Sequence, residues 1–469
     1  MKRKKVLSIL LAFAMCAGVL AGCGEKETDS TGETDSGGTE ESDKADKSDS
    51  TAGGDTVELS MWFWGSTSEQ QAALSKNLID QFNETHPGYH MTVEYRSSVN
   101  KDVAVALSAD EGPDIIYESS PSLALNYIRA GKYANLDAYA EKYGWSDKLL
   151  GCMYDSGVYE DSLYFLPMGL NVIGMVYNKE VLEENHWEVP ETVEELTAIM
   201  DAAMEQGMYA SVTGNKGWQP TNEDYTSLFL NSFGGPDKVY GALTDQIAWT
   251  DEALTGAIRT SSDWYEKGYL CSDYLSLDWA DSAVLLADGR APFYFGPMKF
   301  IQNLIEHKDK DLFGFTAFPA ASKEIPAVYT VGATGLLAIN EKTEHKEVCA
   351  EFLDMMMTND FVEAMANDWP GYWAVPLTTL NEIDMSSFEG LPLMFMEGIA
   401  EACEAIDAGN FGYYNSSYMP AEAFDKMCVV DSVWLGEKDA DAFMEDIDAS
   451  FQKEFDAGTC PICPAPDGE

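Results

Sequence analysis

The sequence predicts an α/β fold, built as one compact body of two α/β lobes behind an N-terminal extension. Three observations predict this fold. Strand-like and helix-like segments alternate from residue 57 to residue 455. Hydrophobic residues make up 45% of the chain and aromatic residues 12%, which is enough for a large core. The 469 residues suffice for two or three ordinary domains or one large bilobed one, and no repeat or second linker divides the body.

The first half of the body predicts a parallel sheet. In the segment 68–85, Leu74, Leu78 and Phe82 recur at helical spacing, and Pro87 follows its end. The order strand, helix, strand, helix, strand is typical of a parallel sheet with helices on both faces. The predicted elements are the strands 57–64, 89–95 and 115–117 and the helices 68–85, around 103–107 and 121–130.

The second half continues with elements of both kinds. Pro190 opens a helix, and Thr192 and Glu195 have the spacing of a capping box. The other predicted elements are the strands 172–177, 292–295, 313–318 and 335–339 and the helices 256–267, 347–357, 360–366 and 440–455.

The N-terminal sequence is typical of a bacterial lipoprotein. Four cations at residues 2–5 precede the apolar run 6–20, which is shorter than the roughly 20 residues of a membrane span. The tetrapeptide Leu20-Ala21-Gly22-Cys23 then resembles a lipobox. The alternative is an ordinary signal peptide with a chance cysteine.

We therefore expect three N-terminal parts. Residues 1–22 are predicted to be a signal peptide, and Cys23 is predicted to carry the lipid. The rest of 23–56 is rich in Gly, Ser, Thr and acidic residues, so it is predicted to be a disordered tether. The protein would then be anchored at the outer face of the cytoplasmic membrane of a bacterium, which we expect to be Gram-positive.

The formal net charge of −51 excludes whole classes of function. It arises from 80 acidic and 29 basic side chains. Such a chain repels phosphate backbones, so nucleic-acid binding is not expected. It also repels anionic lipid surfaces, so any membrane attachment must come from something other than a basic patch.

Motifs of catalysis and of metal binding are missing from the sequence. It contains no Gly-x-Ser-x-Gly, no phosphate-binding glycine loop followed by Lys-Ser/Thr, and no His-Glu-x-x-His. Only five histidines occur, which argues against a site of several histidines around a metal. We expect no catalytic residues, no metal and no cofactor.

Cysteine use is unusual for an extracellular chain. Cys460 and Cys463 in the tail are compatible with a small disulfide or with metal chelation, and one such pair is a weak signal. The remaining cysteines of the body are predicted to be buried small hydrophobic residues, which suits an oxygen-poor habitat. These are Cys152, Cys271, Cys349, Cys403 and Cys428.

The order of the motifs resembles the extracellular solute-binding proteins of ABC importers, in the sugar-binding family 1 that includes maltose-binding protein. The resemblance covers nearly the whole folded chain, and its most specific part is the Tyr-Asn-Lys segment followed by the capped helix. The matching motifs are His86-Pro87-Gly88, Gly112-Pro113-Asp114, Leu166-Pro167-Met168, Tyr177-Asn178-Lys179, Phe233-Gly234-Gly235, Asp288-Gly289-Arg290, Gly332 to Asn340 and Gly371 to Pro376.

The resemblance implies a type II periplasmic-binding-protein fold whose two lobes close on a ligand at a hinge. An interlobe cleft would take a carbohydrate, and the partners would be that ligand and the transmembrane subunits of an ABC permease. The chain would act as a monomer, and Gly169 would lie near the hinge. The implied division is 57–168 plus 330–371 for the N-terminal lobe, 169–329 plus 372–459 for the C-terminal lobe, and 460–469 for a tail.

The aromatic site candidates end a strand or lie in polar loops. A sugar presents C–H faces that stack on aromatic rings. Trp64 ends the first strand, and Trp218 lies in a Gly-rich polar loop. Trp369 and Tyr372 belong to the densest aromatic loop, where the resemblance implies aromatic contacts. The alternative for Trp64 and for this loop is core packing.

The polar and glycine candidates follow from strand ends. Glu118 follows the third strand, where the resemblance implies a polar ligand contact, and the alternative is a solvated loop acid. Asn171 lies just past the first crossing between lobes. Asp281 precedes the Phe-Gly strand, and the alternative for it is a structural role. Gly296 ends a strand where backbone must approach closely, and Gly332 resembles the small residues that the family has at the cleft.

We predict a substrate-capture lipoprotein that hands a neutral oligosaccharide to a permease. Without the signal peptide and tether, the body carries about −47, which disfavours anionic ligands unless a local Lys or Arg cluster offsets the field. A neutral or amino sugar fits better. The alternatives are a sensor of the same fold that presents its ligand to a membrane receptor and a secreted glycan hydrolase.

Overall fold

The first sheet contains the predicted strands of the N-terminal half. This computed structural model describes residues 56–217 and 219–466 of the chain. The predicted signal peptide 1–22, Cys23, the tether up to residue 55 and Trp218 lie outside the described residues. The strands in spatial order are β2 (Tyr89–Arg96), β1 (Val57–Trp64), β3 (Ile115–Glu118), β11 (Leu336–Ile339) and β6 (Phe165–Pro167).

The predicted parallel pairing is confirmed for β2, β1 and β3, whereas β11 pairs antiparallel with both β3 and β6. Along β1, Leu59, Met61 and Phe63 are buried, and Trp62 and Trp64 on the other face are half-buried. This period of two follows from the alternation of side chains across a strand. The carboxyl ends of the three parallel strands therefore meet at one edge of the sheet.

Helices cover this sheet, and those at 68–85, 99–108 and 121–129 lie where the sequence predicts helices, whereas the helices between 137 and 155 were not predicted. The predicted helix 68–85 is continuous, with a π-helical turn in its middle, and Thr67 and Gln70 form a capping box at its start. The elements of this half are α1 (Ser68–Leu74), η1 (Ser75–Ile79), α2 (Asp80–Thr85), α3 (Val99–Ser108), α4 (Pro121–Arg129), α5 (Asp137–Tyr143), α6 (Trp145–Lys148), α7 (Gly151–Asp155), the hairpin of β4 (Val158–Tyr159) and β5 (Ser162–Leu163), α14 (Lys346–Asp354) and α15 (Asn359–Asp368).

The second sheet is largely antiparallel, so the strand–helix pattern does not produce a second parallel sheet. β7 pairs antiparallel with β8, β9 and β10, and only β10 and β12 run parallel. The strands β6 and β7 are separated by only two residues, too few for a crossover helix, so the chain passes straight into the new sheet. The strands are β12 (Phe411–Tyr413), β10 (Tyr329–Ala333), β7 (Leu170–Asn178), β8 (Phe293–Pro297) and β9 (Phe313–Thr316).

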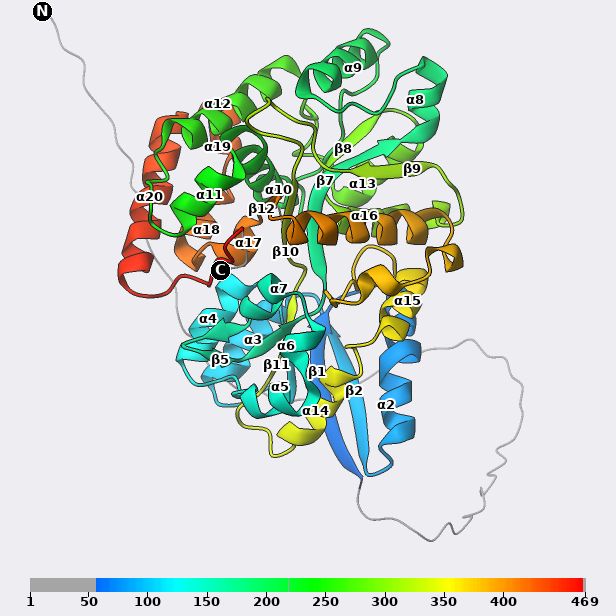
Figure 1. The fold of residues 1–469 in the computed structure, drawn as a ribbon, viewed down its shortest axis with the longest axis vertical. Helices are drawn as coiled ribbons and strands as arrows, with labels where there is room; N and C mark the ends of the chain where they lie inside the picture. Colours follow the sequence, from blue (N-terminus) through cyan, green and yellow to red (C-terminus); the bar gives the residue numbers. More distant parts are fainter. Residues whose placement is uncertain (1–55, 218, 467–469) are drawn as a thin grey trace, which may run out of the picture. The chain divides into compact units, whose positions relative to one another are not determined.

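Helices surround the second sheet, and α16 packs against β7, β9, β10 and β12 (Figure 1). The predicted capping box is confirmed, because the Thr192 side chain accepts a hydrogen bond from Glu195 N. The elements of this half are α8 (Lys179–Asn185), α9 (Val193–Glu205), α10 (Pro220–Phe229), η2 (Leu230–Gly234), α11 (Pro236–Leu243), α12 (Glu252–Lys267), α13 (Trp279–Ala287), η3 (Met298–His307), η4 (Leu380–Glu382), η5 (Met385–Ser387), α16 (Gly390–Asp407), α17 (Asn415–Tyr418), α18 (Ala421–Met427), α19 (Asp431–Trp434) and α20 (Ala440–Asp456).

Two short connections between the sheets are hydrogen-bonded to each other and to a third segment. A Cβ on Gly169 would lie 2.6 Å from the carbonyl oxygen of Tyr372, so glycine permits this close approach. The bonds run from Met168 N to Gly335 O (2.9 Å), from Thr334 N to Gly169 O (2.9 Å) and from Leu170 N to Ala374 O (2.8 Å).

The chain changes sheets near, but not at, two of the predicted lobe limits. Residue 330 falls inside β10, which belongs to the second sheet, so the return to the first sheet lies between Ala333 and Leu336. Residues after 371 still contact the first half, because Leu150 N donates to Pro376 O at 2.8 Å. The helix α16 then packs on the second sheet.

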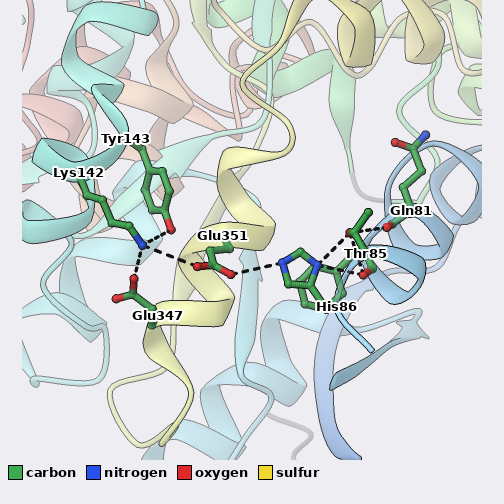
Figure 2. A network of polar contacts seen from close by, with 8 residues as sticks. Gln81, Thr85, His86, Lys142, Tyr143, Glu347 and Glu351 are labelled. Atoms are coloured by element: carbon green, nitrogen blue, oxygen red, sulfur yellow. Dashed lines mark hydrogen bonds and ion pairs between the residues drawn. The ribbon is translucent and has the colours of Figure 1, made fainter. Parts of the chain in front are cut away.

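A polar network ties three helices of the first half together (Figure 2). Lys142 of α5 forms ion pairs with Glu347 and Glu351 of α14, the latter at 3.7 Å. Glu351 also lies 3.3 Å from Nε2 of His86, which follows α2. Because these side chains are partly exposed, each pair contributes little stability on its own.

The seven described cysteines are unpaired thiols. Cys271, Cys349 and Cys403 are buried, and the other four are half-buried. Burial raises the pKa of the Cys460 thiol to about 12, so the thiol stays protonated at neutral pH. Within the described ranges, no helix has the length and apolar character needed to cross a bilayer, and no group of His, Cys, Asp or Glu side chains is arranged to hold a metal ion.

Candidate ligand-binding site

A cavity of about 810 Å³ lies between the two sheets, and both halves of the chain line it. The first half contributes the carboxyl ends of β1 and β3 and the residues after β2, the place where ligands bind in open parallel sheets. The second half contributes the starts of α10 and α13, part of η3 and the segment after β12. The lining includes Trp64, Gln70, Ser97, Asn100, Lys101, Tyr117, Ser119, Ser120, Lys216, Glu223, Asp278, Trp279, Lys299, Gln302, Asn303, Thr334, Tyr372, Tyr414, Ser416 and Phe424.

Aromatic rings form the wall beside the first sheet. The rings of Trp64 and Tyr372 are 5.4 Å apart at 62°, and both line the cavity. The hydroxyl groups of Tyr372 and Tyr117 lie 3.2 Å apart. Two sequence-predicted residues, Trp64 and Tyr372, are thus brought together from strand β1 and from a loop about 300 residues later. Rings with attached hydroxyls suit a ligand with apolar faces and polar edges.

Trp369 lies behind this wall, inside the core. Its side chain is 2% exposed, and it is not among the lining residues. Its ring stacks on Tyr372 at 5.3 Å and 14°, and Phe63 and Trp373 contact it as well. Of the two interpretations that the sequence allowed, the structure places Trp369 in core packing, where it supports Trp64 and Tyr372.

Polar side chains form the opposite wall. The Tyr414 hydroxyl donates to Glu223, and it lies 3.4 Å from Oδ1 of the neighbouring Asp224. Asp224 is 1% exposed, and burial raises the pKa of its carboxyl, although the nearby Lys299 ammonium opposes the rise. The Lys299 ammonium also lies 5.9 Å from the centre of the Tyr414 ring. This wall therefore offers hydrogen-bond donors and acceptors, and it carries charged groups of both signs.

Direct hydrogen bonds join the two halves beside the cavity. Gln70 of α1 donates from Nε2 to Oε1 of Gln302 in η3 at 2.9 Å. Ser122 of α4 donates to the carbonyl oxygen of Ser416 at 2.9 Å and to that of Met419. The walls are thus in contact in this structure, as expected for a closed arrangement of two lobes.

Glu118 ends β3 immediately beneath the cavity wall. Its carboxyl is fully buried, and Oε1 accepts a hydrogen bond from Ser119 N at 2.9 Å. Oε2 has no hydrogen-bond partner among the described residues. Burial raises the pKa of Glu118 to about 7, and the hydrogen bonds from Ser119 oppose the rise. Glu118 itself is not among the residues that line the cavity, whereas its neighbours Ser119 and Ser120 are.

The stability of the protein is expected to depend on the ionisation of Glu118. Its folded-state pKa lies above the ordinary value of 4.5, so the folded state binds the proton more tightly than the unfolded state. The Glu118 contribution is therefore fully present below pH 4.5 and is lost as pH rises to about 7. Wild type should lose about 3 kcal/mol of unfolding free energy over this range relative to Glu118→Gln. Urea unfolding of both proteins at pH 4.5, 6 and 8 measures the difference.

The exposed Glu111 provides a control for this experiment. Glu111→Gln replaces an exposed carboxylate in the same half of the chain, so its free energy of unfolding should stay within about 0.5 kcal/mol of that of wild type. If the Glu118→Gln profile also runs parallel to wild type, the buried carboxyl does not titrate as described.

Asn171 and the two candidate glycines lie in strands of the second sheet. Asn171 is 1% exposed, and its amide atoms have no partner among the described residues. Its register partner is Gly332, where a Cβ would lie 2.3 Å from the Ser417 hydroxyl. A Cβ on Gly296, whose φ is +152°, would lie 2.3 Å from the Tyr294 hydroxyl. None of these three candidates is among the residues lining the cavity, and both glycines serve close packing.

Asp281 is placed in the first turn of α13. It forms a capping box with Asp278, whose side chain accepts a hydrogen bond from Asp281 N at 2.9 Å. Asp278, and not Asp281, lines the cavity. The candidate Trp218 is outside the described residues, and Lys216 and Pro220 on either side of it line the cavity.

The sequence interpretation did not include the lining residues Glu223, Lys299 and Tyr414. Glu223 lies on α10, a helix that had not been predicted, and it meets Tyr414 from 191 residues away. Tyr117 was easier to identify from the sequence as a lining residue, because it directly precedes the candidate Glu118 at a strand end. Tyr414 directly follows Tyr413, the last residue of the short strand β12, and this pair of tyrosines at a strand end is its local signal.

The chain has a ligand-sized cavity between two α/β halves, and this arrangement is typical of two-lobed solute-binding proteins. The profile of the family described as bacterial extracellular solute-binding protein matches residues 64–363, and the chain belongs to this family. Membership confirms the predicted fold class, and it places the chain among extracellular binding proteins rather than enzymes.

Named relatives and a solved structure are consistent with this membership. The alpha-glucosides-binding periplasmic protein AglE of Rhizobium meliloti is 25% identical over 383 residues, which cover 73% of this chain and 81% of that protein. The multiple sugar-binding protein of Streptococcus mutans is 22% identical over 310 residues, 64% of this chain and 71% of that one. A solved chitin oligosaccharide binding protein has a TM-score of 0.71 at 20% identity, covering 85% of this chain and 99% of that one, and it shares the fold.

Proposed function

We propose that this protein captures a neutral oligosaccharide between its lobes and delivers it to an ABC permease. The observation that carries the proposal is the composition of the cavity, in which aromatic rings face hydroxyl, amide and charged side chains. Sugar rings have apolar C–H faces and polar edges, so both kinds of wall are needed. The sugar-binding names of the relatives support the same class of ligand.

The charges in the cavity favour a ligand without net charge. Lys101, Lys216 and Lys299 line it together with Glu223 and Asp278, and the buried Asp224 lies beside them. Three cations thus line the cavity with two carboxylates, and this small local excess does not offset the field of a body with a charge of about −47. Charged side chains of both signs bind the hydroxyl groups of a neutral sugar well.

The cavity volume supports a ligand of several sugar units. Ligand sites for small molecules commonly occupy about 300 to 1,000 Å³, and 810 Å³ lies toward the upper end of this range. Rings are present on both walls of the cavity, with Trp64 and Tyr372 on one wall and Trp279 and Tyr414 on the other. An oligosaccharide would use both, whereas a single sugar would leave one wall without contacts.

The cellular setting completes the proposal. Cys23 would carry the lipid anchor, and the acidic tether would hold a monomeric binding protein at the outer face of the cytoplasmic membrane of a Gram-positive bacterium. Lobe closure would present one face of both lobes to the permease. Mass spectrometry of the N-terminal peptide from cell membranes checks the lipid on Cys23.

We also propose that the three hydrogen-bonded connecting segments are the hinge. Residues 167–170 and 333–336 cross between the sheets, and residues 372–376 are hydrogen-bonded to them, so these three segments would absorb the change of backbone angles. The lobes would then be divided at these segments, close to the limits 168, 330 and 371 implied by the resemblance.

Thermal unfolding in the presence of sugars tests the function. The chain from Gly24 is expected to unfold at a higher temperature with a neutral oligosaccharide, because ligand at about 1,000 times its Kd adds about 4 kcal/mol of stability. Raffinose, maltotriose and chitin oligosaccharides are suitable probes, and amino acids and galacturonate oligomers serve as non-sugar and anionic controls. Differential scanning fluorimetry measures the midpoint.

The controls separate the parts of the proposal. A shift with galacturonate oligomers alone would refute the neutral ligand but keep carbohydrate binding. If no carbohydrate changes the midpoint while an amino acid or another polar solute raises it, the carbohydrate proposal fails. Release of shortened sugars during the incubation would contradict a pure binding role.

A further inference from the structure

The C-terminal segment after α20 leaves the second half of the chain and reaches the first. Helix α20 packs on α18 and α12, and its Glu454 carboxylate accepts hydrogen bonds from the backbone N–H groups of Glu422 (3.1 Å) and Ala423 (2.9 Å). The helix is followed by Gly458, whose φ of +64° turns the chain. Figure 1 shows the segment beyond α20 running from the foot of that helix toward α17 and α7.

Residues 460–462 contact an apolar surface of the first half. Together with this surface they enclose a small pocket beside α4, the hairpin β4–β5 and β6. Cys460 is half-buried there, and Ile462 is 41% exposed. The residues of the first half that line the pocket are Pro121, Leu125, Ile128, Ser156, Val158, Tyr159 and Phe165.

Residues 464–466 return to the second half. The buried Tyr413 hydroxyl of β12 donates to the carbonyl oxygen of Pro464 at 3.0 Å. Pro466 lies against the turn after α16, because a Cβ on Gly409 would be 2.4 Å from the Pro466 carbonyl oxygen. One segment of about nine residues thus contacts the first half with its middle and the second half with both of its ends.

We propose that residues 458–466 form a clasp that holds the two lobes in the closed arrangement. The coupling runs through α4, because Leu123 lines the ligand cavity whereas Leu125 and Ile128 contact the clasp. Opening the cavity moves α4 away from the second sheet. In the open state the clasp must then lose either its contact with the surface around Leu125 or the hydrogen bond that it accepts from Tyr413. Because only the closed state keeps both contacts, the clasp shifts the two-state population toward the closed state.

The clasp gives the Cys-Pro-Ile-Cys motif a role without a disulfide or a metal. The two thiols and Ile462 provide small apolar contacts, and the two prolines, Pro461 and Pro464, lower the conformational entropy that the segment loses on docking. The inference uses the two-lobed fold and does not depend on which ligand the cavity takes.

Truncation of the clasp tests the proposal without any ligand. A chain ending at Gly458 is expected to have a larger radius of gyration by small-angle X-ray scattering than the full chain. Amide hydrogen exchange in residues 119–128 should become about tenfold faster, which is the effect expected from losing one partly buried aliphatic contact and one hydrogen bond. A chain ending at Pro466 keeps the clasp and is the matched control.

Point variants keep the test decisive if the truncated chain does not fold. Ile462→Asp places a charge against the apolar surface, and Leu435→Asp changes a residue of similar exposure (44%) on another surface. Ile462→Asp and Tyr413→Phe should each accelerate exchange in 119–128, and Leu435→Asp should not. The proposal is overturned if the folded Ile462→Asp protein has the exchange rates and radius of gyration of wild type.

Discussion

Replacing Trp369 with alanine is expected to lower the free energy of unfolding by about 3 to 5 kcal/mol. The ring is 2% exposed and contacts Phe63, Trp64, Tyr372 and Trp373, so its removal leaves a large cavity among rigid aromatic neighbours. Close-packed rings cannot collapse into that space without leaving their rotamers. Urea unfolding followed by circular dichroism measures the loss.

Trp187 is the matched control for this substitution. It lies just after α8 and is only partly buried, so Trp187→Ala removes the same side chain with a cost below about 2 kcal/mol. Similar costs for the two variants would show that the Trp369 ring is not packed as the structure describes. Trp369→Ala should also weaken sugar binding, because Trp64 and Tyr372 lose the ring that supports them.

Replacing Trp64 with alanine is expected to weaken oligosaccharide binding about 30-fold with a smaller effect on stability. The side chain is half-buried and lines the cavity, so its face is available to a sugar ring. Loss of one stacked ring costs about 2 kcal/mol of binding free energy, which corresponds to this change in Kd. Isothermal titration calorimetry with the sugar found by thermal unfolding measures it.

Trp62 offers a control on the same strand and the same face. Its ring is covered by the Arg96 guanidinium at 3.5 Å, and it is not among the residues that line the cavity. Trp62→Ala should therefore leave Kd within about threefold of wild type. An unchanged Kd for Trp64→Ala, or an equal loss for both variants, would remove Trp64 from the ligand site.

Local elements were predictable wherever the signal lies within a few residues. The strand 57–64, the helix 68–85 and the capping box of Thr192 and Glu195 all appear as predicted, because side-chain period and caps depend on near neighbours. Pairing in the second sheet was not predictable in this way. Partners such as β7 and β10 are more than 150 residues apart, and their direction depends on connections and not on local propensity.

The site was predictable only in part, for a related reason. Trp64 and Tyr372 line the cavity as the sequence interpretation expected, whereas Trp369, from the same loop as Tyr372, lies in the core. Both loop residues are aromatic, and nothing within the loop distinguishes an exposed face from a buried one. Asp281 proved to be the third residue of a capping box at the start of α13, whereas the N-cap residue Asp278 lines the cavity.

The sequence alone determined the acidic composition, the lipoprotein-like N-terminus, local elements such as the strand 57–64 and the helix 68–85, and the resemblance to solute-binding proteins. Only the tertiary structure decided which rings face the cavity, how its lysines and carboxylates balance, and that the Cys-Pro-Ile-Cys tail contacts both halves. The physical reason is one of distance along the chain. Caps and periodicity act over a few residues, but the exposure of Trp64 and the burial of Trp369 depend on segments about 300 residues apart packing against each other.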